Sequence, residues 1–133
     1  MYTKPALTLS EANQIVEVAI AEAKQHNWSV AVAVVDDGGH LLAMQRMEDC
    51  SAVSAYIAIE KARSAALGRR ETKIYEDMIN NGRNAFLSVP QITATMEGGV
   101  PFIHEGHHVA AVGVSGLKPD QDALIAKAGL AAI

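Results

Sequence analysis

Two histidines, His104 and His107, stand on either side of Glu105-Gly106, between two apolar runs. A two-residue turn there would place these histidines opposite each other on paired strands, with His108 pointing to the opposite face. Two imidazoles and the Glu105 carboxylate suit a divalent metal, and an imidazole also serves as a haem ligand. The alternative is a solvated hairpin tip, because loop ends are commonly polar without any bound group. His104 and His107 are the predicted metal ligands of the chain.

A second polar pair, Asp36 and His40, brackets a tight turn that contains Gly38-Gly39. His40 can ligate a metal or move a proton near neutral pH, and Asp36 can act as a base if it is buried. The alternative is that both side chains hydrogen-bond the backbone of the turn, as short polar side chains at turns usually do. If the chain is an enzyme, Asp36, His40 and Lys61 are its predicted catalytic residues.

Two cations, Arg46 and Lys61, are predicted to bind a small molecule that carries carboxylates. The planar guanidinium of Arg46 can hold a carboxylate through two hydrogen bonds. Lys61 lies in an alanine-rich stretch, where it is either an anion anchor or a surface residue with its amine in water. Ordinary ion pairing with Glu48 or Glu60 is an equally good interpretation.

The segment around Gly113, Ser115 and Gly116 precedes a helix that Pro119 is suited to begin. Free backbone N–H groups at a helix N-terminus favour anions. The glycines either allow a ligand to approach the backbone or allow close packing against the alanine-rich helix. Ser115 is a predicted ligand-binding residue on the first of these interpretations.

The elements that must position these residues follow from apolar periodicity and turn residues. Helices are predicted over residues 8–25, 51–67 and 71–83 and from Pro119 onward, and strands over residues 29–35, 40–47, 100–104 and 107–115. Thr8 or Ser10 is expected to cap the first helix, and Gly68 to end the second. Residues 84–99 are irregular, with a short strand expected around Ile92 to Met96. Two hairpins imply one antiparallel sheet with helices packed over it, an α+β fold in a single domain over 1–133.

Composition excludes several function classes. Half of the 133 residues are hydrophobic, the net charge is −4, and no run of basic residues is present, which argues against a nucleic-acid partner. Cys50 is the only cysteine, so an internal disulfide is excluded and a reducing compartment is favoured. No signal peptide is recognisable and the apolar runs are too short to span a bilayer, so a cytoplasmic protein without a membrane partner is expected.

Five short motifs, in order from residue 29 to 130, carry a resemblance to a known family. They are VVDDGGHL at 34–41, RME at 46–48, IEKARSA at 59–65, GGVP at 98–101 and AVGVSG at 111–116 followed by Asp122. Together they resemble the HbpS/GlcG-like family of haem-binding proteins, and also the C-terminal domain of PduO-type cobalamin adenosyltransferases. Gly99, in the GGVP motif, joins the predicted ligand-binding residues.

The resemblance implies a profilin-like fold, with about five antiparallel strands flanked by helices, and assembly into dimers or larger rings. It also makes haem, or another tetrapyrrole, the candidate cofactor. Some members of the family hold the haem iron with a histidine on the first helix. Residues 8–24 contain no histidine here, and His26 lies only at the end of that helix.

Three hypotheses about function follow from these residues and the resemblance. The first is an oligomeric protein that binds a small ligand such as haem. The second is a small enzyme of a catabolic pathway, an isomerase or hydrolase acting on a carboxylated metabolite. The third is an accessory subunit that stabilises a larger enzyme.

Overall fold

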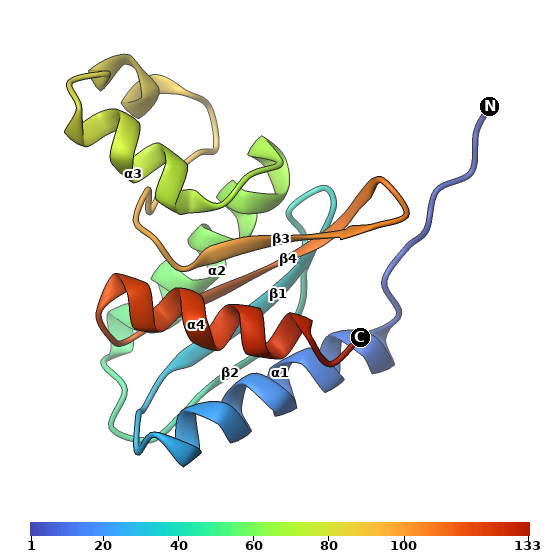
Figure 1. The fold of residues 1–133 in the computed structure, drawn as a ribbon, viewed down its shortest axis with the longest axis vertical. Coiled ribbons are helices and arrows are strands. Elements are labelled where there is room, and N and C mark those ends of the chain that lie inside the picture. Colours follow the sequence, from blue (N-terminus) through green and yellow to red (C-terminus); the bar gives the residue numbers. More distant parts are fainter.

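The computed structural model describes residues 1–133 as four α-helices and a short 3-10 helix around one sheet (Figure 1). The elements are α1 (Leu9–Gln25), β1 (Ala31–Asp36), β2 (Leu41–Arg46), α2 (Ala52–Gly68), α3 (Thr72–Asn80), η1 (Asn84–Ser88), β3 (Gly99–His104), β4 (His107–Ser115) and α4 (Pro119–Leu130). The α+β fold predicted from the sequence is confirmed. No helix has both the length and the apolar character needed to cross a membrane.

The sheet has four strands in the order β2-β1-β4-β3, and every neighbouring pair is antiparallel. The expectation of about five strands was therefore wrong by one, and residues 92–96 form no strand. Their backbone instead supplies acceptors to distant side chains: the Ser64 hydroxyl donates to the Thr93 carbonyl, and the Thr72 hydroxyl to the Met96 carbonyl. Ala94 adopts a left-handed conformation, which breaks the extended geometry that a strand requires.

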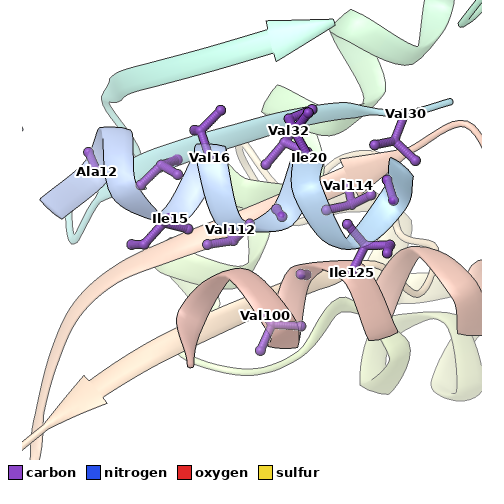
Figure 2. Close-up of a cluster of buried hydrophobic side chains, with 14 residues drawn as sticks. Ala12, Ile15, Val16, Ile20, Val30, Val32, Val100, Val112, Val114 and Ile125 are labelled. Atoms are coloured by element: carbon purple, nitrogen blue, oxygen red, sulfur yellow. The ribbon is translucent and has the colours of Figure 1, made fainter. Parts of the chain in front are cut away.

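The two faces of the sheet are covered differently, which Figure 1 shows as α1 and α4 in front of the strands and α2 behind them. Valine and isoleucine side chains fill the space under α1 and α4 (Figure 2). The other face is built mainly from alanine: Ala31, Ala33 and Ala111 of the strands meet Ala58, Ala62 and Ala65 of α2. Small side chains on both sides let α2 lie close against the sheet.

The helix ends agree with the predicted caps in one case and differ in another. Thr8 caps α1, with its hydroxyl accepting from the Glu11 N–H while the Glu11 carboxylate accepts from the Thr8 N–H. Gly68, predicted to follow α2, is instead its last residue, and Arg69 takes the left-handed position. A side chain at residue 68 would collide with the Tyr75 hydroxyl, which accounts for glycine there.

Candidate functional site

Both hairpin turns lie at the same end of the sheet, because β1 and β4 are antiparallel with Asp36 paired to Ala110 (Figure 1). One turn joins β1 to β2 and the other joins β3 to β4. Four of the five histidines, at positions 40, 104, 107 and 108, are thereby brought to this end. Most of the side chains that could bind a metal or transfer a proton therefore lie at this end of the sheet.

Asp36 organises the first turn and orients the ring of His40. One carboxylate oxygen, Oδ1, accepts from the backbone N–H of Gly38 and of His40, both at 2.9 Å, and lies 3.2 Å from His40 Nδ1. Because an ionised carboxylate can only accept, Nδ1 carries the ring proton. In the neutral form of the ring, Nε2 then carries the lone pair, and the His40 side chain is 81% exposed.

Beside this ring lies an open hollow of about 600 Å³, which we call the His40 hollow. It is lined by Gly38, Gly39, His40, Leu41, Arg63, Leu67 and Gln91. The turn can sit this close to α2 because residue 39 is glycine: a Cβ there would lie 2.9 Å from Arg63 Cγ. The hollow thus combines an oriented imidazole, a guanidinium and two leucine side chains.

Arg63, Leu67 and Gln91 were not among the site residues predicted from the sequence. Arg63 and Leu67 are four residues apart, and helical spacing places them on one stripe of α2. The Arg63 guanidinium contacts the Glu60 carboxylate, which also accepts from the Thr93 hydroxyl at 2.7 Å. The helical stripe was a usable signal, whereas nothing local to Gln91 indicates its place in the hollow.

Lys61 lies in the interior, away from the His40 hollow, and is only 2% exposed. Its ammonium donates to the Val114 carbonyl at 2.9 Å and to Asp122 Oδ2 at 3.1 Å. The other Asp122 oxygen accepts from the Leu117 N–H at 3.1 Å. The pair therefore ties α2 to β4 and α4. Arg46 is exposed at the far end of β2, so the structure does not bring the two predicted carboxylate-binding cations together in one chain.

Burial raises the pKa of the Asp122 carboxyl, although the Lys61 ammonium and the Leu117 N–H oppose that shift. The folded chain therefore binds this proton before the unfolded chain does. The relevant pH window lies between the raised pKa of Asp122 in the folded chain and its ordinary pKa of 3.8 in the unfolded chain. As the pH falls through this window, the contribution of Asp122 to the free energy of unfolding should increase.

Thermal unfolding as a function of pH checks this prediction. The stability of the wild type relative to Asp122→Asn should increase as the pH falls through this window. Asp120→Asn, at an exposed position of the same helix, serves as the control: it keeps the Asp122 carboxyl, so it should still gain stability relative to Asp122→Asn on acidification. A wild type that loses stability relative to Asp122→Asn on acidification would mean that Lys61 lowers the pKa more than burial raises it.

Gly99 and Ser115 also lie on the inner side of the molecule, under α2, and not in the His40 hollow. A Cβ at Gly99 would collide with the Lys61 carbonyl oxygen. Ser115 is buried, and its carbonyl accepts from the Cys50 thiol at 3.9 Å. Of the two interpretations of the segment around Gly113, Ser115 and Gly116, close packing against the alanine-rich helix is the one that the geometry shows at Gly113.

His104 and His107 are paired across the β3–β4 hairpin, as the predicted two-residue turn requires. His104 lines a separate cavity of about 190 Å³, whose other walls are Pro5, Ala6, Leu7, Glu11, Phe102, Val109 and Ile133. No three metal-binding side chains of the chain converge on one point. His108 Nδ1 is buried and lacks a hydrogen-bond partner. Metal binding by His104 and His107 stays a prediction.

The sequence and the fold of this chain are similar to those of known proteins. The family model described as "Haem degrading protein HbpS-like" matches residues 7–131. Protein GlcG of Escherichia coli K12 is 56% identical over 115 residues, which cover 86% of this chain and 85% of that protein. Among solved structures, a double mutant of HbpS from Streptomyces reticuli has a TM-score of 0.92 at 28% identity, covering 100% of this chain and 90% of that one. A PduOC:heme complex has a TM-score of 0.86 at 28% identity, covering 97% and 96%.

Proposed function

This chain belongs to the HbpS-like family of haem-degrading proteins, and we propose that it binds a small carboxylate-bearing ligand, haem or another tetrapyrrole, in the His40 hollow. The observation that carries the proposal is the free Nε2 of His40 beside a guanidinium and two leucines. A relative of the same fold has been solved with haem, which supports haem as the candidate. We further expect a cytoplasmic homo-oligomer with no nucleic-acid or membrane partner.

The residues of the hollow fit the requirements of such a ligand. A neutral imidazole nitrogen is a common axial ligand of haem iron, and a carboxylate on the other ring nitrogen fixes the ring and raises its basicity. Arg63 lines the hollow, and the N–H groups of its guanidinium that do not contact the Glu60 carboxylate would be available to a propionate. Leu41 and Leu67, 47% and 41% exposed, supply apolar walls that the ligand would cover. The volume of about 600 Å³ lies within the range of small-molecule sites.

Replacing His40 by alanine should abolish saturable hemin binding, measured as the shift of the Soret band on titration. Asp36→Asn should weaken binding by about tenfold or more, because the ring loses the acceptor that orients it. His104→Ala is the matched control, since it removes an exposed imidazole from the neighbouring hairpin and leaves the hollow unchanged. Wild-type affinity in His40→Ala, or its loss in His104→Ala, would move the site away from the His40 hollow.

The Asp36–His40 pair also favours a second candidate function, proton transfer on a carboxylated metabolite by an isomerase or hydrolase. A carboxylate that orients an imidazole is the arrangement that prepares histidine to act as a general base. A carboxylic acid that raises the melting temperature of the wild type and is turned over only while His40 is present would favour this candidate over haem binding.

A further inference from the structure

The segment over residues 91–94 borders the His40 hollow through Gln91 and is attached to α2. The attachment is made by the backbone of Thr93: the Ser64 hydroxyl donates to the Thr93 carbonyl at 2.6 Å and accepts from the Thr93 N–H at 3.0 Å. Ser64 is completely buried, so these bonds lie in the interior. Gln91 and Ala94, on either side of Thr93, both have a left-handed backbone. The segment therefore has a defined shape and a fixed place on the helix.

The Thr93 side chain is connected to the Arg63 guanidinium through one carboxylate. The Thr93 hydroxyl donates to Glu60 Oε2 at 2.7 Å, while Glu60 Oε1 contacts Arg63 Nη1. Glu60 is the ion-pair partner of Arg63 within the chain. Glu60 and Ser64 are four residues apart on α2, so both lie on the side of the helix that the segment covers. The bonds to Ser64 thus place the Thr93 hydroxyl where it holds Glu60 against Arg63.

This arrangement leaves part of the Arg63 guanidinium for a ligand. A guanidinium has five N–H donors, and the contact with Glu60 is made by Nη1, so Nε and Nη2 stay without a protein partner. The Arg63 side chain lines the hollow and is 31% exposed. A free arginine side chain loses rotamer freedom when it binds a ligand, whereas one already held by a carboxylate has lost that freedom beforehand. Glu60 therefore prepares Arg63 for binding.

We propose that Thr93 is a positioning residue for carboxylate recognition in the His40 hollow, and that it acts through Glu60 on Arg63. The inference rests on the proposed function and adds the feature by which the hollow selects its ligand. The Thr93 hydroxyl itself touches no ligand. It fixes Glu60, and so the Nη1 end of Arg63, which leaves Nε and Nη2 to hold a carboxylate. The hollow should therefore prefer a ligand with a free carboxylate over the ester of the same ligand.

Soret titrations with hemin and with hemin dimethyl ester, in the same detergent solution, test this role. Thr93→Val keeps the shape of the side chain and the backbone bonds to Ser64 but removes the hydroxyl. It should weaken hemin binding by about three- to tenfold, the effect of one lost hydrogen bond, and leave the affinity for the ester unchanged. Thr93→Ser retains the hydroxyl and should bind hemin like the wild type. Equal losses for hemin and its ester, or hemin binding that is unchanged or tighter in Thr93→Val, overturn the positioning role.

A double variant tests whether Thr93 acts through Arg63. Arg63→Ala should bind hemin more weakly than the wild type and should bind the dimethyl ester equally well. Adding Thr93→Val to Arg63→Ala should cause no further loss of hemin affinity, because the residue to be positioned is already gone. A further loss in the double variant would mean that Thr93 acts by another route, which contradicts the inference.

Chemical modification of Arg63 tests the geometry without any ligand. Phenylglyoxal reacts with guanidinium groups, and peptide mass spectrometry gives the rate at each arginine. Thr93→Val should raise the rate at Arg63, because Glu60 no longer holds the guanidinium, whereas Thr93→Ser should not. Arg46, exposed at the end of β2, is the internal reference and should react equally in all three proteins. An unchanged rate at Arg63 in Thr93→Val overturns the inference. A wild type that fails to bind hemin while this rate rises as expected counts against the proposed function alone.

Discussion

Lys61→Met is expected to destabilise the fold by about 3–5 kcal/mol, as removal of one partner from a buried ion pair typically does. The loss arises because Asp122 keeps its place in the interior while the ammonium 3.1 Å away is gone. The Val114 carbonyl loses a donor in the same step. Urea unfolding followed by circular dichroism measures the change as a lower midpoint at an unchanged slope.

The double variant Lys61→Met with Asp122→Leu separates a structural role from a ligand role. With both charges removed, most of the lost stability should return, because a well-packed apolar pair avoids the cost of burying charge. Hemin binding by the folded double variant should match the wild type, since the Lys61 amine does not line the His40 hollow. Loss of hemin binding in that variant would instead restore Lys61 to the ligand-binding residues predicted from the sequence.

The sequence predicts the scaffold wherever a local signal is sufficient. The Thr8 cap depends on residues three positions apart, and Pro119 begins α4 because its fixed φ suits the first helical position. The pairing of His104 with His107 follows from the length of the turn between them. Each of these features involves neighbours in the chain, so pattern and propensity contain the information that determines it.

The features that could not be predicted from the sequence depend on contacts between distant segments. Residues 92–96 have a strand-like composition, but hydroxyls from α2 and α3 capture their carbonyls, which no local pattern reports. Lys61 and Asp122 are 61 positions apart, so their pairing could not be inferred from spacing.

The residues of the candidate site also fall into two groups, those that a local pattern identifies and those that only the fold brings to the hollow. Asp36 and His40 belong to one turn and were identified from the sequence as candidates. Arg63, Leu67 and Gln91 reach the hollow only because α2 lies close beneath the β1–β2 turn. The separation of Arg46 from Lys61 is likewise a property of the fold, because one lies on an exposed strand end and the other in the interior.

Gly113→Ala is expected to destabilise the fold by about 1–3 kcal/mol or more, and to weaken hemin binding at a hollow that residue 113 does not line. A Cβ at this position would collide with the Ala58 carbonyl oxygen and lie 2.5 Å from the Ala62 nitrogen. Both atoms belong to the backbone of α2, so no side-chain rotation relieves the contact. The helix must move away from the sheet, and Arg63 and Leu67 would then move relative to His40.

Gly106→Ala provides the comparison, because its Cβ would meet nothing within 4 Å. Its expected cost is about 1–2 kcal/mol from the left-handed backbone of the β3–β4 turn, with no change in hemin affinity. Urea midpoints and Soret titrations of both variants test whether the close fit of α2 on the sheet positions the hollow. If Gly113→Ala lowers stability but binds hemin with wild-type affinity, the hollow depends on the β1–β2 turn alone, and the packing of α2 does not position its ligand-binding groups.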